Sequence, residues 1–363
     1  MFLAPKKIDW YIFRKFMGTF FVALLLIIGI VIIFDISEKI DDFEEKKAPL
    51  NAIIFDYYLN FIPYFINMYS PMFVFITVIF FTSKMASNSE IVAILSGGVS
   101  FHRMMVPYMV AAVLITILSL GLNLFVIPEA NKDLVKFEQQ YLKEKPKKAN
   151  RNIHYQVAPG QFVYAESFSS WNNTAYKFTI ERIEDSKLVS KISAETAVYD
   201  TINGSWRLKK YFIREFNDDL TDDIRSGRQL DTIIPLSVKD FYFSENTVTT
   251  LNYAELNEMI RIQKMRGDAN VKHALIEKNT RFALPFSAIV LTIIGVSLSS
   301  KKRRGGIGWN IALGIALAFT YILFMRFSQM FVHTDTLSPA VALWLPNLVF
   351  TLIAIFLYRI APK

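Results

Sequence analysis

Cysteine is missing from the 363-residue sequence, and histidine is scarce. Without cysteine there is no disulfide bond, no thiolate metal site and no cysteine nucleophile. The four histidines (His102, His154, His273 and His333) are far apart, and none belongs to an HExxH-type pair, so we expect no metal site. A Gly-Lys-Ser or Gly-Lys-Thr signature is also absent. The glycines within 305–308 open an apolar segment, which favours a packing motif over a phosphate cradle.

Long apolar segments dominate what is present. The chain is 53% hydrophobic and contains 32 Phe, a composition that is rare in a soluble protein of this length. A hydrocarbon core about 30 Å thick takes about 20 helical residues to cross. Six segments meet or approach that length: 11–34, 53–83, 101–127, 282–298, 307–332 and 340–358. The second contains Pro63, Pro71 and Asn67, so we expect a tilted or kinked helix whose polar groups face protein or a cavity.

Lysine and arginine predict how these segments are oriented. They cluster before the first segment, between the second and third, and at 301–304 between the fourth and fifth, whereas residues 35–47 are rich in acidic side chains. The positive-inside rule therefore places both termini and the basic links in the cytoplasm, and residues 153–248 outside. The first segment is expected to stay as a span, with Trp10 and Tyr11 at the interface. The formal charge of +8 thus reflects topology and does not indicate nucleic-acid binding.

The central part of the chain has a different periodicity. Apolar and polar residues alternate over 176–181 and 206–209, between turn signals such as Asn203-Gly204. We predict a membrane α-helical bundle of six transmembrane helices with an inserted antiparallel β-sandwich or β-jellyroll-like domain. The predicted division is 1–127, 128–252 and 253–363, the last beginning with an amphipathic connecting helix over 253–266 that Gly267 closes. A strand edge of this domain either pairs with another protein or is capped and inert, and periodicity leaves both open.

The link between the second and third segments predicts a short cytoplasmic helix at 86–98. Ser87, Asn88 or Ser89 can cap its first turn, Glu90 favours the helix dipole, and Gly97-Gly98 ends it. Four residues give it an apolar face: Ile91, Val92, Ile94 and Leu95. Such a helix either lies in the membrane interface or acts as a lever that docks into a cytoplasmic ATPase.

Four short motifs, in order, carry a resemblance that covers essentially the whole chain. They are SEIVAILSGG at 89–98, QFVYAE at 161–166, SWRL at 205–208 and KNTRFALPFS at 278–287. Together they resemble the LptF/LptG permeases of the lipopolysaccharide export transporter, and the compact length favours the G-like subunit. The resemblance implies a bacterial inner-membrane protein with six spans and a periplasmic β-jellyroll, without catalytic activity or a cofactor of its own.

The resemblance also implies partners. It predicts a heterodimer with the related LptF-like permease and a pair of cytoplasmic LptB ATPases, which bind ATP and dock on the loop that holds Glu90. The jellyroll would pass lipopolysaccharide toward LptC and LptA. The family carries a basic residue near the outer end of the first span, where this chain has Ile32, Ile33 and Phe34 and its nearest cation is Lys39.

A lipid path for an anionic, bulky lipid needs apolar walls and cations near its outer mouth. The wall candidates are Phe65, Phe73 and Phe327, and the cation candidates are Lys39, Lys278, Arg281 and Arg326. Arg326 lies inside the fifth segment, where a charge costs about 2.5 to 3.5 kcal/mol, so it should face a cavity or a counter-charge. For Lys278 and Arg281, snorkelling and phosphate binding both remain open.

Two functions of other classes compete with lipid extraction. A polytopic lipid-modifying enzyme would need clustered acids, bases or metal ligands near the interface, and the acidic residues here are scattered. A mechanotransmission subunit of the FtsX or MacB kind usually has its outer domain after the first of four spans, whereas here it follows the third of six. The sequence therefore favours an ABC permease that extracts lipid.

Overall fold

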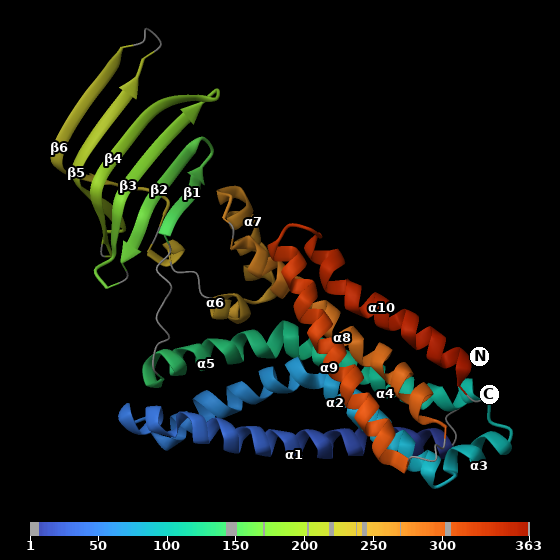
Figure 1. The fold of residues 1–363 in the computed structure, drawn as a ribbon. Helices are drawn as coiled ribbons and strands as arrows, with labels where there is room; N and C mark the ends of the chain where they lie inside the picture. Colours follow the sequence, from blue (N-terminus) through green and yellow to red (C-terminus); the bar gives the residue numbers. More distant parts are fainter. Residues whose placement is uncertain are drawn as a thin grey trace. The chain divides into compact units, whose positions relative to one another are not determined.

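The computed structural model describes residues 7–142, 151–169, 171–201, 203–217, 221–236, 238–241, 245–268, 270–301 and 306–361. The chain forms two compact units (Figure 1). The membrane unit comprises Met1–Lys143, Thr249–Tyr253 and Leu275–Lys363, and the sheet unit comprises Glu144–Val248 and Ala254–Ala274. The connecting helix and the first residues of the fourth span therefore belong to the sheet unit.

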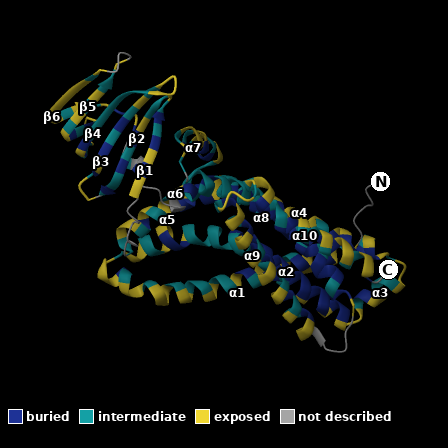
Figure 2. Ribbon diagram, turned by 45° about the horizontal axis from the view of Figure 1, so that its top comes forward, coloured by how far each residue is buried: buried dark blue, intermediate teal, exposed yellow. Residues whose placement is uncertain are grey.

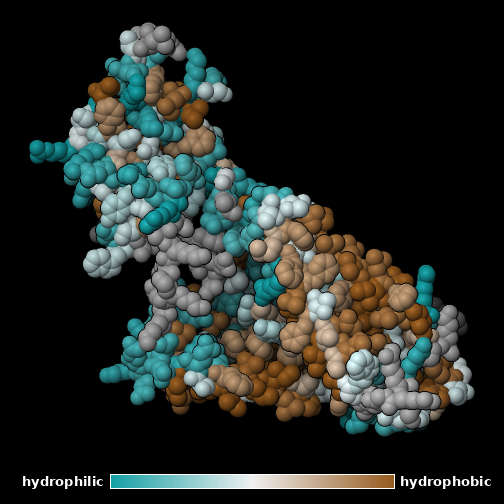
Figure 3. All heavy atoms as spheres, in the orientation of Figure 1, coloured by the Kyte–Doolittle hydropathy of each residue, from teal (hydrophilic) through white to brown (hydrophobic). Residues whose placement is uncertain are grey.

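Six helices of the described residues are long and apolar enough to cross a membrane, which confirms the predicted helical bundle. Two of them contain a π-helical stretch: η1 (Ala52–Tyr58) leads into α2, and η2 (Leu122–Val126) joins α4 to α5. Helix α6 (Glu245–Thr250) belongs mostly to the sheet unit. The α-helices of the membrane unit are α1 (Lys7–Glu45), α2 (Leu59–Ser87), α3 (Glu90–Ser96), α4 (Phe101–Gly121), α5 (Ile127–Tyr141), α8 (Val271–Ser299), α9 (Gly306–His333) and α10 (Pro339–Ile360). Figure 3 shows their apolar side chains as a brown surface.

Helix α2 lies at the centre of the membrane unit and continues through Pro63 and Pro71. Two glycines let neighbouring helices approach it. A Cβ at Gly295 on α8 would lie 2.8 Å from Val78 Cγ1, and a Cβ at Gly314 on α9 would lie 2.3 Å from Ile79 Cδ1. Small residues at helix contacts permit this close packing in membranes.

Helix α1 packs differently along its length. Its N-terminal half buries Ile12, Phe16, Phe20 and Leu24 at a spacing of four residues, which places them on one face. Between Leu24 and Phe43, the structure describes every residue of α1 and finds none of them buried (Figure 2). The apolar residues 25–34 of this helix therefore present their surface to lipid or to another protein.

The sheet unit contains six antiparallel strands in sequential order. They are β1 (Arg151–Ala158), β2 (Gln161–Ser169), β3 (Thr174–Glu184), β4 (Lys187–Asp200), β5 (Ser205–Phe216) and β6 (Asp222–Thr232). Positive φ angles at Asp185 and Ser186 form the two-residue turn between β3 and β4. Gly160 lies in the turn between β1 and β2. A Cβ there would lie 2.5 Å from the Ile183 carbonyl oxygen, so the β1–β2 turn requires glycine.

The core of the sheet unit lies on one face of the sheet. Trp206 on β5 is fully buried, and its Nε1 donates a 2.7 Å hydrogen bond to the Leu236 carbonyl. Ile234, Leu236 and Phe241 join the same core. The antiparallel domain is thus confirmed, but the described strands form one meander rather than the two packed sheets of a sandwich. Alternation in sequence indicates a half-buried strand, and it does not say whether a second sheet or a returning segment covers the apolar face.

Helix α7 (Tyr253–Arg266) confirms the predicted connecting helix. It buries Leu256 and Ile260, and Gly267 follows it in the left-handed region with φ +65°. The Asp268 amide then donates to the Gln263 carbonyl, as in a glycine-terminated helix.

Candidate functional site

The predicted cytoplasmic lever is the seven-residue helix α3. Ser89 occupies its N-cap position in a left-handed conformation with φ 62°, and its side chain makes no capping bond. Backbone geometry therefore starts the helix, where the sequence suggested a side-chain cap. Gly97 follows the last turn, and Gly98 has a φ of +83°, so the predicted Gly-Gly ending is confirmed.

The apolar residues of α3 point in two directions, some into the core of the membrane unit and one to the surface. Ile91 is 1% exposed and packs in the same core as Ile12, Phe16 and Met85, with Ile94 and Leu95 partly buried against it. Val92 is 54% exposed. The four apolar residues predicted to form one face therefore differ: Ile91 packs within its own subunit, and Val92 is exposed. Successive helix residues point about 100° apart, so helical spacing could have separated Ile91 from Val92.

Glu90 contacts the first helix. The Tyr11 hydroxyl donates a 2.8 Å hydrogen bond to Glu90 Oε2, and Lys15 Nζ donates to the Tyr11 hydroxyl. Asp9 and Arg103 form a second link, a bidentate pair between α1 and α4 whose first bond is 2.8 Å long. The sequence reasoning treated Tyr11 only as an interfacial anchor and missed both links, because no spacing rule connects residues that far apart.

A pocket of about 150 Å³ lies within the membrane unit, between α2, α8 and α9. Its lining includes Arg281, Arg326 and Glu277. Arg281 is 2% exposed; its Nε donates to Glu277 Oε1 over 2.8 Å, and its Nη1 donates to the Leu251 carbonyl over 2.9 Å. The Arg281 side chain is therefore buried and paired. It does not extend to the membrane interface by snorkelling, and it is not accessible to a phosphate group.

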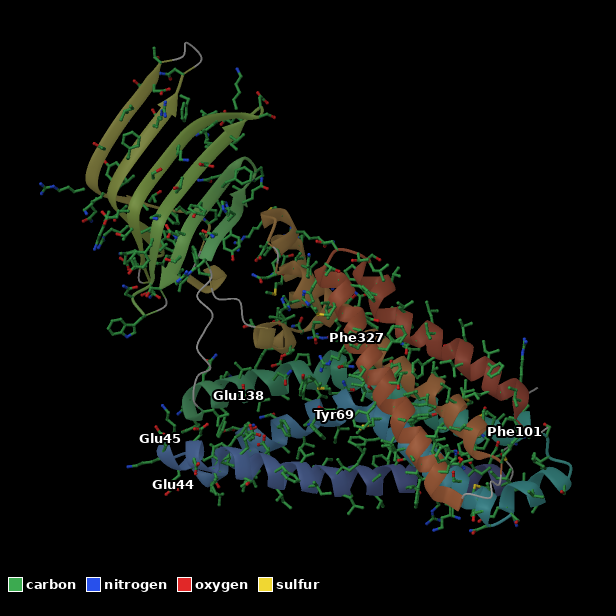
Figure 4. The ribbon with its side chains drawn as sticks, in the orientation of Figure 1. Glu44, Glu45, Tyr69, Phe101, Glu138 and Phe327 are labelled. Atoms are coloured by element: carbon green, nitrogen blue, oxygen red, sulfur yellow. The ribbon has the colours of Figure 1, made fainter. Side chains whose placement is uncertain are left out.

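Arg326 lines the same pocket from α9 and is exposed. Its Nη1 lies 3.4 Å from Gln329 Oε1, which is a weak contact for a guanidinium. This position agrees with the expectation that a charge inside the fifth span faces a cavity or a counter-charge. Phe327, the next residue, is 64% exposed on α9 (Figure 4).

A buried polar chain fixes the wall of the pocket. Ser119 donates to Asn67, Asn67 Nδ2 donates to Asn123 Oδ1 over 2.7 Å, and Asn123 Nδ2 donates to the Arg281 carbonyl over 3.2 Å. These bonds join α2, α4, η2 and α8. The prediction that the polar groups of the second span turn toward protein holds for Asn67, which is buried.

The remaining lipid-path candidates lie apart from this pocket. Lys39 is paired with Asp35 and hydrogen-bonded to Tyr57, so its charge is largely compensated. Lys278 Nζ lies 5.7 Å from the centre of the Tyr253 ring. Phe73 is buried in the core, and Phe65 is half-buried against Tyr69. Of the seven candidates, the structure therefore brings only Arg281 and Arg326 together at one pocket.

The acidic stretch at residues 35–47 mostly continues α1, which runs to Glu45. Glu44 and Glu45 end this helix, and Glu138 lies on α5 at the same end of the membrane unit (Figure 4). Phe43 and Phe137 pack edge to face, 5.9 Å between ring centres, which joins the two helices there. Among the described residues, no group of three or more His, Asp or Glu is placed to hold a metal ion.

The sequence model of one family, described as lipopolysaccharide export system permease LptF/LptG, matches residues 10–360. The chain belongs to the LptF/LptG family. The match spans all six apolar helices and the inserted sheet, so this is a multi-pass inner-membrane permease of lipopolysaccharide export. Its family consists of transporter permeases and not of enzymes. A comparison with curated proteins found no matching sequence.

Proposed function

We propose that this chain is a permease subunit of an ABC transporter that extracts lipopolysaccharide from the inner membrane and passes it to a periplasmic bridge. The observation that carries the proposal is the family match over residues 10–360, joined to a fold with six spans and one inserted sheet. A separate ATPase would supply the energy and bind the ATP, and the chain itself would need no cofactor.

The proposed orientation follows the basic links. Both termini, α3 and the link between α8 and α9 would face the cytoplasm, and the sheet unit would face the periplasm. A cytoplasmic α3 is available to an LptB-like ATPase dimer through Glu90 and the exposed Val92. Burying Val92 against that partner would remove its apolar side chain from water.

The exposed outer part of α1 supports a second proposed partner, a related LptF-like permease. Its unburied residues 25–34 are all apolar or glycine, so this stretch can face either that subunit or lipid. Strand edges of the sheet unit would pass the lipid to LptC-like and LptA-like periplasmic proteins by strand pairing.

The proposed lipid path uses the exposed outer surface of α9. Arg326 offers a guanidinium at the pocket, and Phe327 offers an apolar wall. Arg281 would act indirectly, because its own donors are committed to Glu277 and Leu251. Lys39, Lys278 and Phe65 remain proposed contacts, and Phe73 would shape the wall from within the core.

Site-specific photo-crosslinking in cells tests the path. A photoreactive residue at position 326 or 327 should form lipopolysaccharide adducts that decrease when the ATPase is active. Position 110 is a matched control, because Val110 is 54% exposed on a different helix, α4. Equal adducts at 110 and 327, or none at 326 and 327, would show that the lipid does not use this surface.

A further inference from the structure

The inner end of α1 is held tightly by its own subunit. Ile12 and Phe16 are fully buried in the core that also contains Ile91 of α3 and Phe101 of α4. Outward of Leu24, the helix continues to Glu45 and buries only Phe43. At 1.5 Å per residue, the stretch from Leu24 to Phe43 is about 30 Å long. Its far end is held as well, because Asp35 accepts from the Tyr58 hydroxyl and Phe43 packs on Phe137 of α5. Helix α1 is thus held at both ends and has no buried residue between Leu24 and Phe43.

Two polar links add to this packing. Tyr11 bonds Glu90 at the head of α3, while Lys15 bonds the Tyr11 hydroxyl from the next turn of α1. Asp9 forms the bidentate pair with Arg103 at the start of α4, and both side chains are mostly buried, at 17% and 19% exposed. Glu90 is the first residue of α3, and Arg103 follows α3 at the start of α4. The two links therefore join α1 to both ends of the segment 90–103, which contains α3.

We infer that Tyr11, Asp9 and Arg103 are positioning residues that make α1 move with α3. In this arrangement, a displacement of α3 by the docked ATPase is carried through Tyr11–Glu90 and Asp9–Arg103 to the inner end of α1. Because α1 is one continuous helix with no buried residue between Leu24 and Phe43, a movement of its inner end is carried along the helix to the contacts that Asp35 and Phe43 make with η1 and α5. This inference rests on the proposed function and adds the physical connection between the ATPase and the lipid path.

An alternative use of the same bond makes the opposite prediction. Tyr11 could hold Glu90 in a resting state that must break before the ATPase docks. Removing the hydroxyl would then increase docking and transport, whereas removing a transmission link decreases transport without changing docking. The two arrangements are therefore separable by measuring docking and transport in the same samples.

The test uses the full chain purified with its natural partners and reconstituted in proteoliposomes with lipopolysaccharide. Tyr11→Phe removes the hydroxyl that bonds Glu90 and keeps the ring. Thr19→Val is the matched control, because the Thr19 hydroxyl bonds only within α1, to the Lys15 carbonyl. Three quantities are measured: ATPase recovered with the chain, ATP hydrolysed, and lipopolysaccharide released per ATP.

We expect Tyr11→Phe to keep wild-type ATPase recovery and to release at least about threefold less lipopolysaccharide per ATP, since a hydrogen bond to a charged group is lost. Thr19→Val should match the wild type. Asp9→Arg and Arg103→Asp should each reduce the lipopolysaccharide released per ATP. The variant with both changes exchanges the two charges and should restore most of the release, which a general loss of folding would not allow.

Three results would overturn the inference. The first is an unchanged amount of lipopolysaccharide released per ATP in Tyr11→Phe and in both single charge variants. The second is a larger amount released per ATP in Tyr11→Phe. The third is an amount released per ATP that falls only in proportion to ATPase recovery. Wild-type protein that releases no lipopolysaccharide with ATP would overturn the proposed function as well, so the two failures are distinguishable.

Discussion

Replacing Arg281 with leucine should destabilise the membrane unit rather than affect transport alone. The guanidinium is 2% exposed and holds both Glu277 and the Leu251 carbonyl. Leucine removes all of these donors and leaves a carboxylate beside the pocket without its cation. Arg281→Glu would be worse, because it would place two carboxylates one helical turn apart.

The size of the effect follows from burial. Removing one partner of a buried ion pair costs about 3 to 5 kcal/mol. The Glu277 side chain is 26% exposed and can regain some water, so the lower end of that range, about 3 kcal/mol, applies. Changing both residues to leucine leaves no unpaired charge, so the double variant should lose only about 1 kcal/mol.

Unfolding of the purified chain in mixed micelles with increasing dodecyl sulfate measures these free energies. Lys278→Leu is the control: Lys278 lies on the same helix, is only half-buried and contacts the Tyr253 ring, so its loss should cost less than about 1 kcal/mol. Stability of Arg281→Leu equal to the wild type, or a double variant whose loss equals the sum of the two single losses, would refute the assignment of a buried coupled pair.

Four further predictions address the other elements. Gly295→Leu should cost about 1 to 3 kcal/mol in the same unfolding assay, because its side chain would overlap Val78, and an unchanged midpoint would contradict this close packing. Trp206→Phe should cost the sheet unit about 1 to 3 kcal/mol by leaving the Leu236 carbonyl unpaired, detectable as a lower melting temperature. Val92→Asp should reduce ATPase recovery without loss of folded chain, whereas Ile91→Asp should reduce the amount of folded chain itself; the reverse order would mean that α3 presents its other face. Asn203→Cys in this cysteine-free chain should react with an impermeant maleimide once the outer membrane is opened, and labelling only after the inner membrane is broken would reverse the proposed orientation.

The sequence predicted those elements whose cause is local. Six spans follow from the length of the apolar segments, and α7 follows from its apolar spacing and the glycine that ends it. Asn67 could be assigned to the protein interior because an amide in the hydrocarbon needs a partner. The meander could be predicted only as strands, since alternation identifies a half-buried strand without identifying what covers it.

The candidate site depended on contacts between distant residues, and these could not be read from the sequence. Arg281 looked like a cation at a span end, but its burial is decided by Glu277 one turn away and by Leu251 thirty residues earlier. The bond between Tyr11 and Glu90 joins residues 79 positions apart. The role of Ile91 was the exception, because helical spacing already separated it from Val92.

ATP-dependent release of lipopolysaccharide from proteoliposomes is the most direct measurement of the proposed transport. The chain is reconstituted with the partners that co-purify from the membrane, and release to a soluble periplasmic acceptor is followed with and without ATP. We expect release only with ATP. We also expect release to be lost in Glu90→Lys, which reverses the charge at the head of α3. Release that does not require ATP, or no release although the ATPase is bound and active, would show that this chain is not part of an ATP-driven lipopolysaccharide permease.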